Sequence, residues 1–197
     1  MNEWINGLPL FIAATVSAYL AGSLNFAILV FRFNGRDDPR LRGSGNPGAS
    51  NVYRQAGKGW ALVVLMLDVG RAVVVARFAV WLLPLQQVPW IGLALIAGNR
   101  FPCFHGFKGG KGVANYLGFS AVLAPAWTAL GLLAWGLVFL VWRTPFLSSF
   151  AMVFFLAAGT VLSDGMPTWG RFGGLATALF IVACHHGNIR GRWGRQR

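Results

Sequence analysis

Long apolar runs alternate with short polar segments along the 197 residues of this chain. A helix needs about 20 mainly apolar residues to cross a bilayer, so runs near that length predict membrane-spanning helices. Residues 112–124 form a shorter run, and its length alone does not decide whether it is a membrane span. The longer runs lie near residues 8–31, 60–83, 88–104, 125–142, 146–162 and 172–186. The pattern therefore predicts six or seven crossings.

The charges between the runs select the number of crossings, because Lys and Arg concentrate in short cytoplasmic loops. Segment 32–59 and the C-terminal tail are rich in Arg, whereas the connection 84–89 is uncharged. Residues 1–8 and 163–170 carry an acid each and no base. Only an odd number of crossings satisfies all of these segments. We therefore predict an all-α integral membrane protein with about seven transmembrane helices, its N-terminus outside and its C-terminus cytoplasmic.

The composition agrees with a membrane protein, since 56% of the residues are hydrophobic, 11% are charged and the mean hydropathy is +0.58. A net charge of +12 is common in nucleic-acid-binding proteins, but there the bases lie on a soluble face. Here the bases sit between apolar runs, so we expect no nucleic acid partner. The N-terminus lacks the basic region of a cleavable signal peptide, so its apolar run is expected to remain as the first span.

The chain has no internal repeat and no low-complexity linker, which predicts a single domain over residues 1–197. Cys103 and Cys184 show neither a metal-type spacing nor a CxxC motif, so we expect buried free thiols and no metal site.

Three polar, glycine-containing stretches remain, and the predicted topology places all three on the cytoplasmic side. They read GSGNPGASNVYR (43–54), GNRFPCFHGFKGGKGVAN (98–115) and HHGNIRGR (185–192). Parts of one site must share a side of the membrane, whereas unrelated loops would scatter. The sequence therefore predicts that these stretches form one site.

Two nucleotide-binding motifs are only superficially present. The glycines of 43–48 have the G-x-G-x-x-G spacing, but that fingerprint requires a strand before it, and Asp68 falls inside an apolar run rather than after a second strand. A P-loop ending on KGGKG would need Gly at position 105 and Ser or Thr at position 112, where the chain has His105 and Gly112. Neither nucleotide class is supported.

The KGGKG segment instead predicts an anion site. Glycine-rich turns bring backbone N–H groups close to an anion, and lysine adds charge just before a helix N-terminus. Lys108, Gly109, Gly110, Lys111 and Gly112 are the candidates here. The alternative is that the two lysines only anchor the loop at lipid headgroups.

The first stretch adds short hydrogen-bonding groups and a guanidinium suited to bidentate phosphate binding. A capped turn leading into a helix explains some of the polar groups, but it does not explain the guanidinium. The candidates in this stretch are Gly43, Ser44, Asn46, Asn51 and Arg54.

The third stretch places His185, His186 and Asn188 at the inner end of the last apolar run. A histidine there is either an interfacial group or part of the predicted phosphate site, and both readings stay open. Asp68 and Arg71 lie three residues apart inside the second run, which predicts an internal ion pair. We favour an architectural role over the alternative, in which the pair organises the site from below.

The motifs GSGNPGASNVYR, GFKGGKGVAN and HHGNI resemble, in order and spacing, those of the PlsY family of bacterial membrane acyltransferases. The resemblance implies a seven-span protein of the bacterial inner (cell) membrane with its active site facing the cytoplasm. It implies transfer of a fatty acyl group from acyl-phosphate to the 1-hydroxyl of glycerol 3-phosphate. The products would be lysophosphatidic acid and phosphate, with no cofactor and with membrane lipid as the surroundings.

The resemblance also assigns roles by position. Ser44 and Arg54 would contact substrate phosphate, and the loop from Lys108 to Gly112 would hold glycerol 3-phosphate with Lys111 as its main charge. His185 and Asn188 would complete the pocket near the reacting groups. The general base is either His185 or a phosphate oxygen of the donor. The implied catalytic residues are Ser44, Lys111, His185 and Asn188, and the implied substrate-binding residues are Gly43, Asn46, Asn51, Arg54, Lys108, Gly109, Gly110 and Gly112.

The chain departs from the family pattern at supporting positions, namely Arg71, Ala72, Asn99 and Gly187. These departures indicate a divergent member. Two other functions remain as alternatives, a phosphate-ester carrier and a non-catalytic lipid-binding relative. The carrier is disfavoured by the short chain and by polar motifs that lie at one face rather than at mid-membrane.

Overall fold

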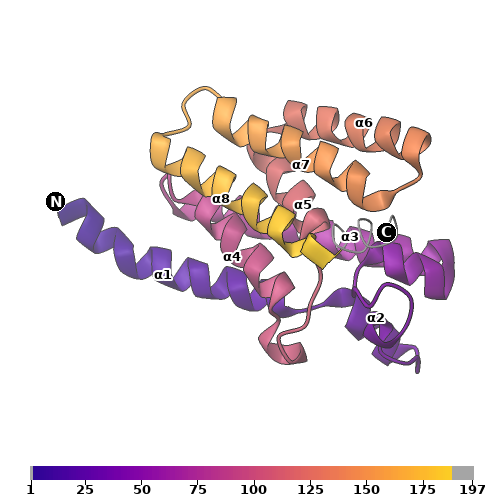
Figure 1. Cartoon of the computed structure of the whole chain (residues 1–197). Helices are drawn as coiled ribbons and strands as arrows, with labels where there is room; N and C mark the ends of the chain where they lie inside the picture. Colours follow the sequence, from indigo (N-terminus) through magenta and orange to yellow (C-terminus); the bar gives the residue numbers. More distant parts are fainter. Residues whose placement is uncertain (1, 188–197) are drawn as a thin grey trace.

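The computed structural model describes residues 2–187, with side chains from residue 7 onward. All regular secondary structure in this part of the chain is helical, as predicted (Figure 1). The α-helices are α1 (Asn2–Ser23), α2 (Phe26–Phe33), α3 (Ala49–Leu82), α4 (Val88–Arg100), α5 (Val113–Leu123), α6 (Pro125–Trp142), α7 (Pro145–Leu162) and α8 (Thr168–Cys184). Two short 3-10 helices, Pro39–Leu41 and Cys103–His105, lie in the loops before α3 and α5.

Each of the predicted apolar runs is helical, but two of the helices are interrupted. The first run breaks at residues 24–25, where Asn25 accepts the N–H of Ile28 (3.1 Å) and starts α2 at a 42° bend from α1. In α3 the interruption is Gly57, whose φ of 84° is outside the helical region. The first turns of α3 therefore stand apart from its long apolar part.

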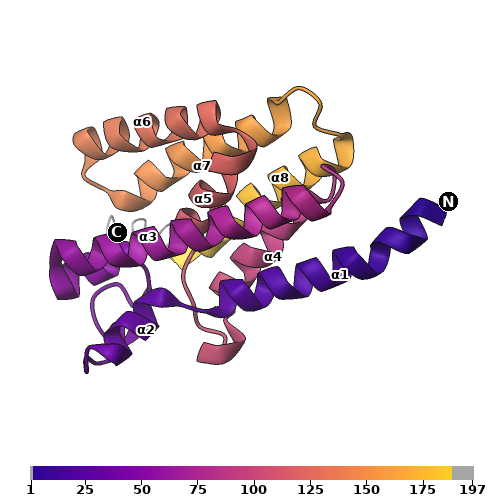
Figure 2. The same cartoon turned by 180° about the vertical axis from the view of Figure 1, so that it is seen from behind.

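Length and composition qualify α3, α6 and α7 as membrane spans among the described helices, and α1 with α2 adds a fourth if the bent pair is one span. The apolar helices α5 and α8 are shorter. Figures 1 and 2 show α6 and α7 side by side on one flank, while α1 runs along the opposite edge.

Glycines allow α1 and α4 to pack closely. A Cβ on Gly22 would lie 2.0 Å from the Leu95 carbonyl oxygen, and a Cβ on Gly98 would lie 2.0 Å from the Tyr19 carbonyl oxygen. Such contacts between small residues are the usual way in which membrane helices approach each other.

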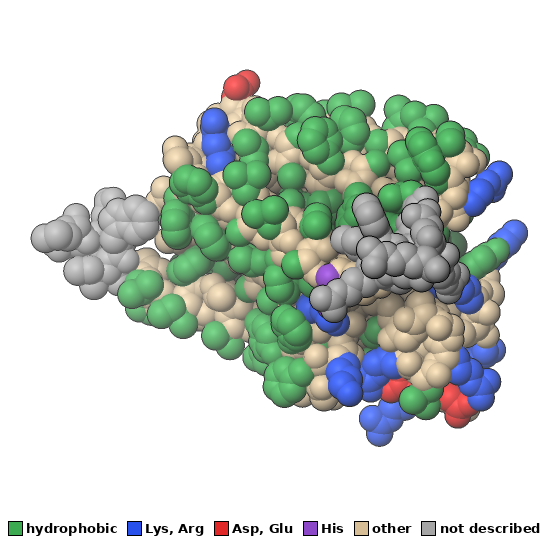
Figure 3. All heavy atoms as spheres, viewed as in Figure 1, with side chains coloured by type: hydrophobic (Ala, Val, Ile, Leu, Met, Phe, Trp, Pro, Cys, Tyr) green, Lys and Arg blue, Asp and Glu red, His purple; other side chains and the backbone are tan. Residues whose placement is uncertain are grey.

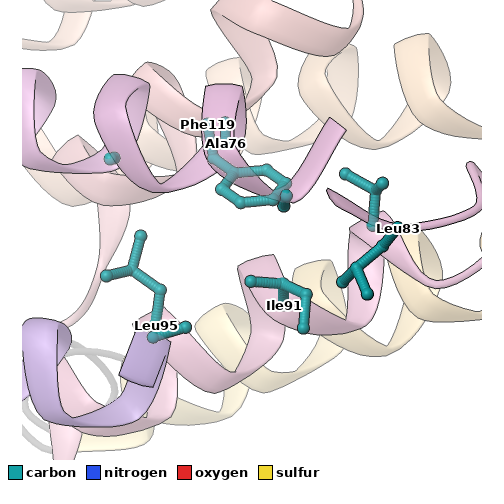
Figure 4. Close-up of a cluster of buried hydrophobic side chains, with 9 residues drawn as sticks. Ala76, Leu83, Ile91, Leu95 and Phe119 are labelled. Carbon is teal, nitrogen blue, oxygen red and sulfur yellow. The ribbon is translucent and has the colours of Figure 1, made fainter. Parts of the chain in front are cut away.

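The largest buried hydrophobic cluster lies between α3, α4 and α5. Figure 4 shows Ala76 of α3, Leu83 directly after α3, Ile91 and Leu95 of α4 and Phe119 of α5 facing one another. This cluster fixes the relative positions of three helices whose ends carry polar loops.

The surface divides into an apolar and a basic region. Figure 3 shows Lys and Arg side chains gathered at the lower right, over α2 and the neighbouring loops, whereas hydrophobic side chains cover the helices above. Large apolar side chains on α6 such as Leu140 and Val141 are 62% and 70% exposed, which is expected for a face in contact with lipid.

Candidate functional site

The side chain of Asn51 organises the loop that precedes α3. Its Oδ1 accepts the backbone N–H of Ser44 (3.0 Å), and its Nδ2 donates to the carbonyl oxygens of Pro39 (2.8 Å) and Arg42 (3.1 Å). A Cβ on Gly43, at φ 66°, would lie 2.3 Å from that Oδ1, so the turn requires glycine. The sequence predicted Asn51 as a substrate contact. This is corrected, because its amide is buried and bonded to the loop that carries Ser44.

Arg40 joins this loop to the one that carries the glycine-rich motif. Its Nη1 donates to the carbonyl oxygens of His105 (2.6 Å) and Lys108 (2.9 Å), while its Nη2 pairs with Asp38 Oδ2 at 2.6 Å. The hydrogen bond from Arg40 is the main cause that holds the pKa of the Asp38 carboxyl below its ordinary value. Two of the three predicted stretches are thus held together.

The glycine-rich loop packs against the C-terminal end of α4. The N–H groups of Gly109 and Gly110 donate to the carbonyl oxygens of Arg100 (3.0 Å) and Asn99 (2.9 Å). The last carbonyls of a helix have no N–H partner within the helix, and here the N–H groups of the loop are their hydrogen-bond donors. A Cβ on Gly109 would lie 2.0 Å from the Asn99 oxygen, so only glycine allows this approach. The expectation that these two N–H groups face an anion is therefore wrong.

Gly112 ends the loop and begins α5. Its φ is 80°, and a Cβ would lie 2.4 Å from Ile96 Cγ2, so two independent constraints require glycine at this position. Its carbonyl oxygen accepts the N–H of Tyr116 (2.8 Å), the first helical bond of α5. Lys111 is thereby fixed between the end of α4 and the start of α5.

Lys111 lies in a cationic cluster built from several elements. It is half-buried, and burial together with the nearby charges of Arg100 and Arg54 lowers its pKa to about 8. The Arg100 guanidinium also lies close to the thiol of Cys184 at the end of α8. Buried cations that repel one another are stabilised by a bound anion, so this cluster is suited to a phosphate group.

His185 borders the same cluster from the end of α8. Its Nδ1 lies 2.8 Å from the Ile181 carbonyl oxygen, and its ring meets the Phe150 ring edge-on with centroids 5.2 Å apart. Burial is the main cause that lowers the pKa of His185, and the charge of Lys111 adds to it. Since only a protonated Nδ1 can donate to a carbonyl, the neutral ring keeps a lone pair on Nε2.

The structure thus brings one residue of each predicted stretch together, namely Arg54, Lys111 and His185. Ser44 and Lys108 are exposed on the two loops that Arg40 joins, and Asn46 is half-buried in the first of them. Asn188 lies outside the described residues. In the described residues, the first and third stretches each place a side chain near Lys111 of the second, and their joint role as one site stays a prediction.

Sequence reasoning missed Arg40 and Arg100. Both were counted only as charges that set the side of the membrane. The signal for Arg100 was its place inside the second stretch, directly after a predicted span. Arg40 gave no such signal, because its partners are backbone carbonyls some 65 and 68 residues away.

The predicted pair inside the second run is formed, with Arg71 Nη2 at 2.9 Å from Asp68 Oδ1. Within residues 2–187, no group of three or more His, Cys, Asp or Glu side chains could hold a metal ion. Fold and site together define a class: a helical protein with an apolar surface and a cluster of cationic side chains at one end of its bundle.

Comparison with known proteins identifies the family. Residues 12–193 match the family described as glycerol-3-phosphate acyltransferase. The chain is 40% identical over 189 residues to the glycerol-3-phosphate acyltransferase of Pseudomonas paraeruginosa, covering 92% of this chain and 96% of that protein. It is 39% identical over 190 residues to that of Azotobacter vinelandii, with the same coverage. The chain therefore belongs to the glycerol-3-phosphate acyltransferase family.

Two solved structures agree with this membership. The fold matches the crystal structure of PlsY (YgiH), an integral membrane glycerol 3-phosphate acyltransferase, in its glycerol 3-phosphate form, with a TM-score of 0.87, 31% identity and coverage of 95% of this chain and 94% of that one. The lysophosphatidic acid form of PlsY matches with a TM-score of 0.85, 30% identity and coverage of 95% and 93%. The predicted resemblance to the PlsY family and the predicted integral membrane class are confirmed.

Proposed function

We propose that this protein transfers a fatty acyl group from an acyl-phosphate to the 1-hydroxyl of glycerol 3-phosphate, and so forms lysophosphatidic acid and phosphate. The observation that carries the proposal is the meeting of Arg54, Arg100, Lys111 and His185 at one end of the bundle, in a chain that belongs to this acyltransferase family. Family membership favours an enzyme over the phosphate-ester carrier.

In this proposal the cations bind and orient the acceptor. The Lys111 ammonium and the Arg54 guanidinium hold the phosphate of glycerol 3-phosphate through charge-assisted hydrogen bonds. Arg100 adds to the local positive field, which also favours the second anionic substrate. Binding both substrates in one site makes the reaction between them effectively unimolecular, which lowers its entropic cost.

The acyl-phosphate already carries a good leaving group, so the reaction needs no covalent enzyme intermediate. The 1-hydroxyl oxygen attacks the acyl carbonyl carbon, the bond from that carbon to the phosphate oxygen breaks, and phosphate leaves with the bonding electrons. The hydroxyl proton goes either to Nε2 of His185 or to a phosphate oxygen of the donor. The lowered pKa of His185 and its Nδ1 bond support Nε2 as an acceptor at neutral pH.

We further propose seven crossings, with the N-terminus outside and the site at the cytoplasmic end of the bundle. The ends of the bundle differ in charge as the positive-inside rule requires (Figure 3). The short helices α4 and α5 would cross with the help of flanking polar residues, and α1 with α2 would form one bent span. Both substrates would then enter from the cytoplasm or from the inner leaflet.

The donor is tested with purified protein, labelled glycerol 3-phosphate and either acyl-phosphate or acyl-coenzyme A, each with and without a metal chelator. We expect lysophosphatidic acid from acyl-phosphate alone, unaffected by the chelator. Product from acyl-coenzyme A only would overturn the proposed donor. Phosphate-ester uptake into proteoliposomes without product would favour the carrier.

A further inference from the structure

A single guanidinium, that of Arg71 on α3, joins several elements inside the bundle. The side chain is only 7% exposed and pairs with Asp68. The ring of Phe26 lies 4.9 Å from its central carbon, measured to the centroid. Its Nη1 donates to backbone carbonyls at the end of α1 and just beyond it, those of Ala21, Gly22 and Leu24.

The remaining contacts of Arg71 reach two buried amides on other helices. Its Nη2 lies 2.6 Å from Asn115 Oδ1 and 3.5 Å from Asn99 Oδ1, and its Nε lies 3.3 Å from Asn115 Oδ1. Asn99 is the penultimate residue of α4, and Asn115 lies in the first turn of α5. One guanidinium therefore contacts both helices that flank the glycine-rich loop.

These two asparagines stand on either side of Lys111. On one side, the Asn99 carbonyl accepts the N–H of Gly110, and its Nδ2 lies so close that a Cβ on Gly110 would be 2.8 Å away. On the other side, Asn115 lies four residues after Lys111, in the first turn of α5. The backbone on each side of Lys111 is thus held by a residue that Arg71 contacts.

Pairing with Asp68 does not by itself explain this arrangement. A single ammonium would neutralise the carboxylate, whereas a guanidinium offers five N–H donors in a rigid fork. Here Nη1 donates to backbone carbonyls near α1, and Nε and Nη2 reach Asn115, Asn99 and Asp68. The shape of the guanidinium, and not only its charge, is used.

We propose that Arg71 is a positioning residue that sets the place of Lys111 in the acceptor phosphate site by holding Asn99 and Asn115. The inference rests on the proposed function, since it assigns Lys111 to the phosphate of glycerol 3-phosphate. Arg71 itself touches no substrate. It fixes the separation between the end of α4 and the start of α5, and the loop between them carries the lysine.

The first test is Arg71→Lys, which keeps the charge opposite Asp68 but cannot reach both amides. We expect the KM for glycerol 3-phosphate to rise about tenfold while kcat at saturation changes less than about threefold. The reason is that a displaced Lys111 binds the phosphate more weakly in the ground state and in the transition state alike. Arg77→Lys, at an exposed position of the same helix, is the matched control and should leave both values unchanged. An unchanged KM in Arg71→Lys would overturn the inference. Asn115→Ala, which keeps the Asp68 pair, replaces Arg71→Lys if that variant does not fold.

A double-mutant cycle with Lys111→Ala separates positioning from general damage. Because Arg71 acts through Lys111, adding Arg71→Lys to Lys111→Ala should change kcat/KM by less than about twofold. If the fold-loss of kcat/KM in the double variant equals the product of the fold-losses in the two single variants, the inference is overturned.

The heat stability gained on adding glycerol 3-phosphate gives a readout that does not depend on catalysis. It should fall in Arg71→Lys and stay at the wild-type value in Arg77→Lys. If the wild type binds glycerol 3-phosphate but forms no product, the proposed function fails while the positioning role is still measured by this shift. If the wild type is active and Arg71→Lys matches it in both KM and shift, the positioning role fails alone.

Discussion

At the scale of single residues, Lys111 is the group in which burial and neighbouring charge act most clearly together. Its pKa of about 8 lies well below that of an ordinary lysine, because burial and two guanidinium groups oppose the charged form. A phosphate dianion would reverse that balance on binding. The same environment that disfavours the charged form of Lys111 before substrate binds therefore favours binding of an anionic acceptor.

This predicts a pH dependence for acceptor capture. Above about pH 8, Lys111 of the protein without substrate loses its proton and its attraction for phosphate, so kcat/KM for glycerol 3-phosphate should fall as pH rises through that value. His185 contributes nothing to this fall, because its lowered pKa keeps it neutral over the same range. Steady-state rates at low glycerol 3-phosphate between pH 6.5 and 9.5 measure the profile. The residual activity of Lys111→Arg should lack the fall, and the same fall in that variant would assign it to another group.

Gly109 gives a prediction about the backbone. In Gly109→Ala the new Cβ would lie 2.0 Å from the Asn99 carbonyl oxygen, so the loop must move away from α4. We expect kcat/KM to fall at least about tenfold and the free energy of unfolding to fall by about 1–3 kcal/mol. Gly59→Ala, where nothing lies within 4 Å, is the matched control and should keep full activity. Equal activity of the two variants would contradict the close approach described here.

At the scale of elements, the site depends on two loops that are held together by Arg40. The Arg40 side chain is 25% exposed and donates to two carbonyls of the second loop, whereas the Arg42 side chain is 71% exposed and pairs with Asp37. Hydrogen bonds from a charged group to backbone carbonyls are worth more than an exposed ion pair. The two arginines, two residues apart, should therefore differ in their effect.

We expect Arg40→Gln to lower the free energy of unfolding by about 1–3 kcal/mol and to raise the KM for glycerol 3-phosphate, because the second loop loses its clamp. Arg42→Gln should change stability by less than about 1 kcal/mol. Thermal melting in detergent and the two KM values provide the comparison. A larger effect of Arg42→Gln on both would show that the first loop is held in another way.

The sequence predicted the helices and the three stretches of the site, because hydrophobic length and basic loops are local signals. It also predicted the pair of Asp68 and Arg71, since two ionisable residues in one apolar run must find each other. It could not predict what the glycines do. Gly109 and Gly110 look like an anion-binding turn in sequence, but their N–H groups are used by α4, which follows only from the tertiary packing. The place of Asn51 was missed for the same reason.

At the scale of the whole molecule, the basic end and the apolar flank fix how the protein should lie in a membrane. The proposed topology is tested in cells with single cysteines in a Cys103→Ala, Cys184→Ser background, using a maleimide that does not cross membranes. Asp164→Cys, in the loop between α7 and α8, should react in intact cells. Ser50→Cys, exposed at the start of α3, should react only after the cells are opened. Reaction of Ser50→Cys in intact cells would contradict the cytoplasmic site.

The central claim is that one site, built from three separate stretches, transfers an acyl group to glycerol 3-phosphate. The direct test measures lysophosphatidic acid and phosphate formed by purified protein from acyl-phosphate and labelled glycerol 3-phosphate. The wild type should form the two products in equal amounts. Arg54→Ala, Lys111→Ala and His185→Ala, one from each stretch, should each lower kcat/KM at least about tenfold, while Arg77→Ala should not. No product from the wild type beside an active relative, or full activity in all three variants, would contradict the account.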